Sequence, residues 1–121
     1  MIDHIGIDVA DYERSKRFYA EALGPLGYEL AMEPVENVGG FAAKGKPDFW
    51  IVAGNASGGT HVAFTADDRA TVEAFHAAAL AAGGKDNGQP GLRPHYHEHY
   101  YGAYVHDLDG NNVEAVCHLP E

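Results

Sequence analysis

The residues best suited to chemistry in this chain are its histidines and carboxylates. The sequence contains eight histidines, and five of them fall after residue 94, where no lysine or arginine occurs. Imidazole and carboxylate groups can bind a divalent metal ion or move protons near neutral pH. The polar chemistry of the C-terminal end therefore depends on these two kinds of group.

Glu114 is the carboxylate with the most informative position. It lies in the middle of a strand-like segment that follows Asp109-Gly110, a dipeptide typical of a tight turn between two strands. Because successive strand residues point to opposite faces, Glu114 shares one face with other even-numbered residues, namely Asn112, Val116 and His118. The opposite face carries Val113, Ala115 and Cys117 and is apolar.

Two histidines stand at matching places in two other strand-like segments. His4 lies in residues 2–9 and His61 in residues 60–66, and both segments alternate so that the histidine faces away from the apolar residues. Two His and one carboxylate form a ligand set that holds Zn²⁺, Mn²⁺ or Fe²⁺ and leaves coordination positions open. We therefore take His4, His61 and Glu114 as a candidate metal site.

A rival site is the histidine tract PHYHEHYY, in which His95, His97 and His99 alternate. Alternate residues on a strand are about 6.6 to 7 Å apart, so neighbouring pairs could chelate an ion but all three could hardly meet one. This tract stays open as an alternative metal site.

The elements that must position these groups occur twice in the same order. After residues 2–9, Asp11 can cap a helix that runs to about Leu23, and strand-like segments follow at residues 28–34, 38–43 and 49–52. After residues 60–66, Asp67 or Asp68 can cap a second helix, which is followed by a strand from about residue 85 and by the final strand pair.

The two halves superpose at an offset of 57 residues, which indicates an internal duplication. The matched pairs include His4 with His61, Asp11 with Asp68, Phe18 with Phe75 and Gly27 with Gly84. We predict one domain, residues 1–121, made of module 1 (about 1–54) and module 2 (about 59–119), joined by a flexible GNASGG connector. The expected fold is α+β: two βαβββ modules forming a curved, partly open eight-stranded mixed sheet around a concave site, with the helices outside.

Composition limits the possible partners. The formal charge of −10 argues against nucleic acid and acidic membrane surfaces. No apolar run reaches membrane-spanning length, and the alternating first residues, which include two acids, predict a strand rather than a signal peptide. The single cysteine, Cys117, is compatible with a reducing compartment, so we expect a cytoplasmic protein.

The chain resembles the vicinal oxygen chelate superfamily, which includes glyoxalase I, extradiol dioxygenases, fosfomycin-resistance enzymes and bleomycin-resistance proteins. The resemblance rests on three segments in order: IDHIGIDVADYERSKRFYAEAL, GTHVAFTADD and AYVHDLDGNNVEAV. They match the way this superfamily opens each module and closes the second. The final turn reads Asp-Leu-Asp-Gly-Asn where the family usually has Asp-Pro-Asp-Gly-Asn.

The resemblance implies a divalent metal ion (Fe, Mn, Zn or Ni) held by His4, His61 and Glu114. This ion would bind two adjacent oxygens of a small-molecule substrate. The fourth ligand of glyoxalase I, a Glu, falls on Trp50, which cannot ligate a metal or accept a proton. The implied chemistry is therefore dioxygenase-like or lyase- or isomerase-like, with a three-ligand site.

The same resemblance implies candidate catalytic residues. His95 and His97 precede Tyr104 at the spacing of the extradiol signature, and Tyr104 in turn precedes Glu114 at the signature spacing. Tyr104 would bind a substrate oxygen, and His97 or His95 would move a proton. The residues expected to line the substrate pocket are Phe49, Trp50, Arg93, Tyr96 and Tyr100.

A different class of function stays open beside the enzyme. Bleomycin-resistance proteins bind a drug-like ligand without a metal, and this chain could be such a ligand-sequestering protein. The resemblance also implies a homodimer, and it leaves open whether His4 and His61 of one chain meet at one ion.

Overall fold

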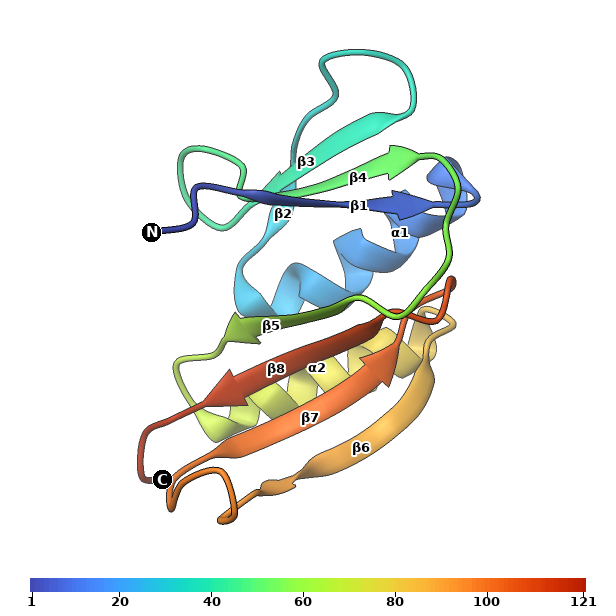
Figure 1. Cartoon of the computed structure of the whole chain (residues 1–121). Coiled ribbons are helices and arrows are strands. Elements are labelled where there is room, and N and C mark those ends of the chain that lie inside the picture. Colours follow the sequence, from blue (N-terminus) through green and yellow to red (C-terminus); the bar gives the residue numbers. More distant parts are fainter.

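The computed structural model describes all residues, 1–121, and shows one βαβββ unit followed by a second (Figure 1). Module 1 consists of β1 (Ile5–Val9), α1 (Tyr12–Leu23), the short 3-10 helix η1 (Gly24–Leu26), β2 (Glu29–Met32), β3 (Val38–Ala42) and β4 (Phe49–Ala53). Module 2 consists of β5 (His61–Thr65), α2 (Arg69–Ala81), β6 (Lys85–Leu92), β7 (Tyr101–His106) and β8 (Asn112–Cys117). The predicted duplication is confirmed.

Each module forms one four-stranded mixed sheet. The strand orders are β1-β4-β3-β2 and β5-β8-β7-β6, and in each sheet the first pair is parallel while the others are antiparallel. The edge strands β1 and β5 lie on the facing sides of the two sheets and form no hydrogen bonds with each other, and both helices lie behind the sheets (Figure 1). The α+β fold with outer helices is confirmed. Its eight strands divide into two four-stranded sheets, and the helices leave the opposite face of each sheet open.

A single hydrophobic core joins the modules. It contains 21 buried residues drawn from both helices and both sheets, which is why the two units pack as one body. In α1 the apolar stripe predicted from the sequence is buried, with Phe18, Tyr19 and Leu23 almost inaccessible to solvent. In α2 the same role falls to Val72 and Phe75.

Both helices begin at the predicted aspartate caps. Asp11 accepts a hydrogen bond from the backbone N–H of Arg14, and Asp68 accepts one from that of Thr71. Each cap satisfies an N–H that would otherwise lack a partner in the first turn. Of the two candidates for the second cap, the structure selects Asp68.

The turn between β7 and β8 ties module 2 to module 1. Asp107 in this turn is buried and accepts a hydrogen bond from the Tyr19 hydroxyl of α1 at 2.5 Å. Asp109 accepts one from the backbone N–H of Ala10 at 3.2 Å. Gly110 follows with φ of 87°, as the predicted tight turn requires. These bonds fix β8, the strand that carries Glu114, relative to the first module.

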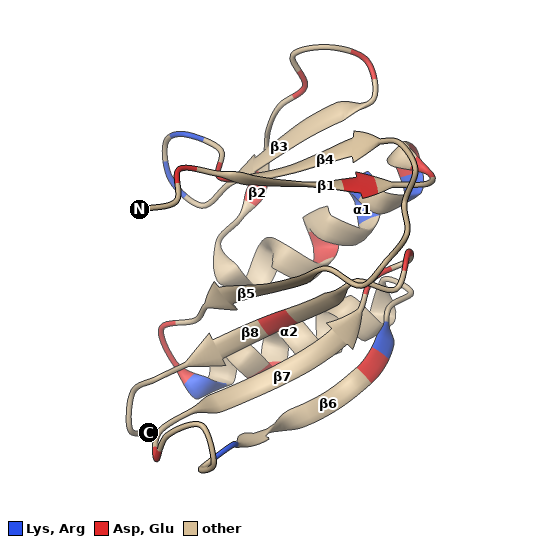
Figure 2. Ribbon diagram, viewed as in Figure 1, with Lys and Arg blue, Asp and Glu red and all other residues tan.

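The first strand is shorter than predicted. It begins at Ile5 rather than Ile2, because its partner β4 begins only at Phe49. Before Phe49, a single backbone hydrogen bond joins the two segments, from Ile5 N–H to Asp48 C=O. His4 therefore precedes the sheet and is exposed. Most charged residues lie in loops and on helices rather than on the strands (Figure 2). None of the helices is long and apolar enough to cross a membrane.

Candidate functional site

A buried carboxylate forms the centre of the site. The Glu114 side chain, in the middle of β8, is 1% exposed. Its Oε1 lies 2.8 Å from Nε2 of His61, and its Oε2 accepts a hydrogen bond from the Tyr100 hydroxyl. A buried carboxylate needs such partners, because it has lost the solvation of water. The prediction that Glu114 and His61 share one sheet face agrees with this geometry.

The strand register explains how these side chains meet. β5 runs parallel to β8 with Ala63 opposite Glu114, so His61 reaches Glu114 diagonally from the end of its strand. On the other side, Tyr104 of β7 stands directly opposite Glu114. Gly102 completes the arrangement, since a Cβ there would come within 3.1 Å of the Tyr100 ring and 3.4 Å of Glu114 Oε2. The missing side chain leaves room for Tyr100 to cover the carboxylate.

The two tyrosines are held in the protonated form. Burial, together with the hydrogen bond to Glu114, raises the pKa of Tyr100 far above its ordinary value. Burial also raises the pKa of Tyr104, and the nearby Glu114 charge acts in the same direction. Both phenols are therefore hydrogen-bond donors at neutral pH rather than bases.

These groups open into a cavity of about 610 Å³, which we call the polar pocket. Its lining residues are His61, Tyr96, His97, Tyr100, Tyr104, Asn112 and Glu114. The structure thus brings together six residues proposed from the sequence, and it adds Asn112. The alternation of β8 had already placed Asn112 on the face of Glu114, so that signal was present but was not used.

The other proposed pocket residues lie elsewhere. Phe49 is buried in the core against Tyr19 and Phe64. Trp50 is half-buried on the open face of module 1. Arg93 lies over the ring of Tyr104, with 5.3 Å between its Cζ and the ring centroid. Its guanidinium donates to the backbone carbonyls of Gly91 and Gln89, so Arg93 supports the pocket from outside.

The histidine tract divides between the pocket and the surface. His97 lines the polar pocket. His95 is exposed and packs on Tyr96, with 4.2 Å between ring centroids. His99 lies 3.4 Å from Glu98. Residues 93–100 are a loop rather than a strand, so the alternation of this tract does not produce a common face.

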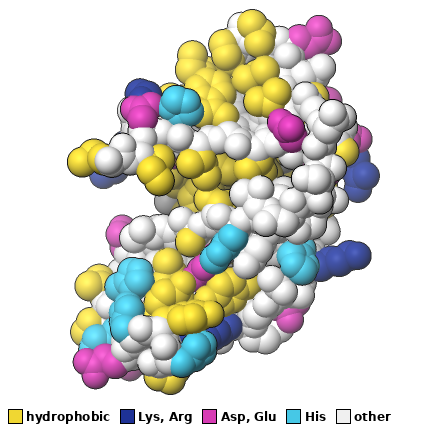
Figure 3. Space-filling model, in the orientation of Figure 1, with side chains coloured by type: hydrophobic (Ala, Val, Ile, Leu, Met, Phe, Trp, Pro, Cys, Tyr) yellow, Lys and Arg dark blue, Asp and Glu magenta, His cyan; other side chains and the backbone are white.

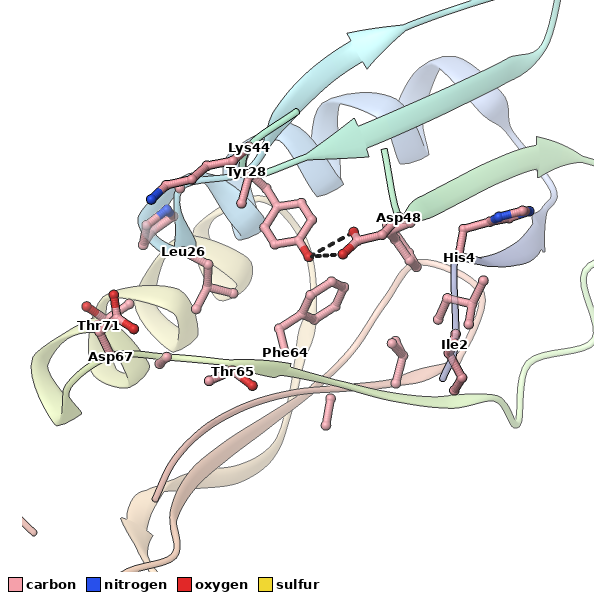
Figure 4. A pocket seen from close by; sticks show the side chains of 18 of the residues that line it. Ile2, His4, Leu26, Tyr28, Lys44, Asp48, Phe64, Thr65, Asp67 and Thr71 are labelled. Carbon is pink, nitrogen blue, oxygen red and sulfur yellow. Dashed lines mark hydrogen bonds between the residues drawn. The ribbon is translucent and has the colours of Figure 1, made fainter. Parts of the chain in front are cut away.

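His4 stands at a second, larger cavity of about 1010 Å³ between the modules, the inter-module cleft. Its ring turns away from the cleft residues Tyr28 and Phe64 (Figure 4), and its Nδ1 lies 2.6 Å from Asp3. His61 lines the same cleft from β5. Within one chain, however, no three His, Cys, Asp or Glu side chains gather where a metal ion could sit. The chain itself unites two of the three proposed ligands.

Comparisons with known proteins identify the fold family. The family described as Glyoxalase-like domain matches residues 4–116, almost the whole chain. The chain belongs to this family. The match supports the resemblance to the vicinal oxygen chelate superfamily that the sequence segments indicated. No curated protein sequence matches the chain.

Solved structures agree with this assignment. A glyoxalase/bleomycin resistance protein from Albidiferax ferrireducens T118 is 30% identical, with 98% of each chain covered and a TM-score of 0.82. A glyoxalase/bleomycin resistance protein/dioxygenase family enzyme from Burkholderia phytofirmans PsJN is 19% identical, with 98% of each chain covered and a TM-score of 0.74. Lactoylglutathione lyase from Agrobacterium tumefaciens is 20% identical over 97% of this chain and 92% of its own, with a TM-score of 0.72. The last two show a common fold only.

Proposed function

We propose that this protein is a small metal-dependent enzyme that binds two adjacent oxygens of its substrate through a divalent ion in the polar pocket. The observation that carries the proposal is the pair formed by His61 and Glu114. One imidazole nitrogen and one carboxylate oxygen, both ordinary ligands of transition metals, lie 2.8 Å apart at the edge of a cavity large enough for a small molecule.

The donors of one chain fit the ion in chemistry but not in number. His61 Nε2 and Glu114 Oε1 can accept an ion between them after a small separation, since metal–ligand distances are about 2.0 to 2.2 Å. His4 is the third proposed donor, but it precedes β1 of module 1, beside the exposed Asp3, and does not line the polar pocket. We therefore propose a homodimer in which His4 of a second copy approaches the polar pocket and completes the ligand set.

The ion, when bound, would act as a Lewis acid that withdraws electron density from the substrate oxygens. Side chains of this protein would orient the metal ligand and bind the substrate. Tyr100 orients the Glu114 carboxylate by donating to Oε2, as partners of metal ligands commonly do. Tyr104, a protonated phenol on the pocket wall, donates a hydrogen bond to a substrate oxygen.

Proton transfer falls to the histidine tract in this proposal. His97 lines the polar pocket and can exchange a proton with bound substrate, whereas His95 reaches it only if the exposed loop moves. The ring walls of Tyr96 and Tyr100, 4.9 Å apart in edge-to-face contact, favour a planar substrate of modest size. We infer a dioxygenase-like or a lyase- or isomerase-like reaction.

A ligand-sequestering function is the alternative that a specific observation favours. Both oxygens of Glu114 are already satisfied by His61 and Tyr100, so the pocket is complete as a hydrogen-bonded binding site. Its aromatic wall could hold a drug-like molecule without an ion.

Metal content separates these functions. We expect elemental analysis of purified, tag-free protein to show a stoichiometric divalent ion that depends on Glu114, so that Glu114→Gln contains one ion fewer per chain than the wild type. The variant keeps the size of the side chain and the hydrogen bond to one partner. Oxygen uptake on a catechol would then select the dioxygenase-like reaction. A metal-free dimer that cannot be loaded with Fe²⁺, Mn²⁺, Zn²⁺ or Ni²⁺ would support sequestration instead.

A further inference from the structure

Two histidines that do not bond to Glu114 face each other, His97 on the wall of the polar pocket and His118 near the C-terminal end of the chain. His118 follows the last residue of β8, and His97 lies in the loop between β6 and β7. Nε2 of His97 is 2.5 Å from Nδ1 of His118, and the rings stack with their centroids 4.7 Å apart. Histidine side chains gather over this end of module 2 in Figure 3.

The hydrogen bonds determine where the protons of the pair reside. The backbone N–H of His99 donates to Nδ1 of His97 at 3.2 Å, so that nitrogen is unprotonated and the His97 proton sits on Nε2. This proton points at Nδ1 of His118, which must accept it. Two imidazole nitrogens from distant parts of the sequence are thus aimed at one point, and one hydrogen bond joins them.

We propose that the His97–His118 pair is a binding site for a divalent transition metal ion, separate from the His61–Glu114 centre. The ion takes the place of the proton between the rings, the His97 proton moves to Nδ1, and the exposed hydrogen bond from the His99 N–H is lost. With its Nε2 on the ion, His97 no longer moves a proton in the polar pocket, so an ion at this site switches off the role proposed for His97 above. Two nitrogens at about 2.0 to 2.1 Å from a tetrahedral ion lie roughly 3.3 Å apart, so the rings need to separate by less than an ångström.

The surroundings select the class of ion. Both rings are exposed, so water can fill the remaining coordination positions. The other histidines of the tract are engaged elsewhere, His95 on Tyr96 and His99 with Glu98. With imidazole donors and no carboxylate, the pair suits Zn²⁺, Ni²⁺ or Cu²⁺ and disfavours Mg²⁺ and Ca²⁺, which prefer oxygen ligands.

The position of the pair links it to the polar pocket. The ring of Tyr100 lies 5.5 Å from that of His97 and 5.3 Å from that of His118, in edge-to-face contact with both. The hydroxyl of the same tyrosine donates to Glu114. An ion that joins His97 to His118 therefore anchors the 93–100 loop to the end of β8 and holds Tyr100 over the carboxylate.

The experiment is a calorimetric titration of tag-free, EDTA-treated protein with ZnCl₂, using Glu114→Gln, His118→Ala and the double variant. His95→Ala serves as the matched control, because it removes an exposed histidine of the same tract that does not face His118. We expect Glu114→Gln to retain one zinc site and His118→Ala to lose that site, with at least about a tenfold fall in affinity. His95→Ala should titrate like the wild type, and the double variant should bind no zinc at either place.

Imidazole ¹⁵N NMR provides a readout that does not depend on the count of sites. Zinc should shift the ring nitrogens of His97 and His118 in the Glu114→Gln variant. The proposal is overturned if Glu114→Gln binds no zinc, or if His118→Ala keeps the site that Glu114→Gln retains. A wild type that binds a single ion lost in His118→Ala but kept in Glu114→Gln would support this site and would count against the proposed function of His61 and Glu114.

Discussion

The open faces of the two sheets can be compared strand by strand, because β4 and β8 each lie between a parallel edge strand and an antiparallel neighbour. In module 2 the central row across the sheet consists of Ala63, Glu114 and Tyr104. In module 1 the equivalent row consists of Gly6, Trp50 and Gly40. One position thus carries a carboxylate with a tyrosine beside it, and the other an indole beside a glycine.

The neighbours of each central residue fit its chemistry. A Cβ at Gly40 would come within 2.8 Å of the Trp50 ring, so the indole occupies the space over that glycine. Glu114 is instead enclosed by hydrogen-bonding side chains, and the nearest is Tyr100, whose hydroxyl donates to Glu114 Oε2. The comparison teaches that a duplicated fold supplies two equivalent positions at the centre of its sheets. The side chains on adjacent strands decide which of these positions can do polar chemistry.

The turns that precede the last strands also differ. The turn of module 2 contains Asp107, which is buried and accepts bonds from Tyr19, from Asn111 and from two backbone N–H groups. The equivalent turn of module 1 carries exposed Lys44 and Lys46. Burial, together with the charge of Asp107, raises the pKa of Tyr19 well above its usual value, so Tyr19 stays a donor.

Removal of Asp107 should have the largest effect on stability. Asp107→Ala leaves several buried donors without partners, and we expect the free energy of unfolding to fall by about 3 kcal/mol. Lys44→Ala in the equivalent turn of module 1 should change it by less than about 0.5 kcal/mol. Urea unfolding followed by circular dichroism measures both. Equal losses in the two variants would contradict the asymmetry between the turns.

Gly40→Ala tests the packing of the central row in module 1. The new methyl group must displace the Trp50 ring, and we expect a loss of about 2 kcal/mol. Trp50 is the only tryptophan, so its fluorescence should shift as well. Gly6→Ala is the matched control: Gly6 lies on the other side of Trp50 in the same row, and a Cβ there would stand at ordinary contact distance, 3.7 Å from Trp50 Cβ. That substitution should change the free energy of unfolding by less than about 0.5 kcal/mol.

Tyr100→Phe tests the cover of the carboxylate in module 2. Loss of the hydroxyl leaves Glu114 Oε2 without its donor, and we expect a fall of about 1 kcal/mol in the free energy of unfolding. Tyr96→Phe removes a hydroxyl from the same pocket that has no hydrogen-bond partner in the chain, and it should have almost no effect. A loss in Tyr96→Phe as large as in Tyr100→Phe would show that the hydroxyls act through general packing.

The smallest effect concerns acid stability. His76 of α2 stands where α1 has Tyr19, and it bonds to Asp86 at 2.9 Å. This hydrogen bond lowers the pKa of Asp86, so the contact stabilises the fold above the unfolded value of about 3.9 and is lost as pH falls through the lower folded value. We therefore expect Asp86→Asn to lose less stability than wild type between about pH 4 and pH 2. Urea midpoints at each pH give the slopes, and Asp67→Asn, an exposed acid of the same module, controls for one lost charge.

Most of the fold was predictable because its signals are local. The caps at Asp11 and Asp68, the apolar stripe of each helix and the Asp109-Gly110 turn act within a few residues, and all three are confirmed. The first strand was misjudged at its start. Its alternation continues to Ile2, but a strand ends where its partner ends, and the partner β4 lies more than forty residues away in the sequence.

The site was predictable only in part. Alternation alone placed Glu114 on the face opposite the core, and the offset of the repeat matched His4 with His61. Neither signal could reveal that Tyr100 covers Glu114 or that His118 meets His97, because both contacts depend on the path of the loop at residues 93–100. Nor could they place the His4 ring, which contacts Asp3 and does not line the polar pocket.

The sequence by itself determined the repeated unit, the faces of the strands and the family. Only the tertiary structure decided which side chains touch, because contacts between strands and loops depend on register and on the turn that joins the modules. Periodicity states the face on which a residue lies, whereas hydrogen bonds such as those of Asp107 and Asp109 set how far that face lies from any other.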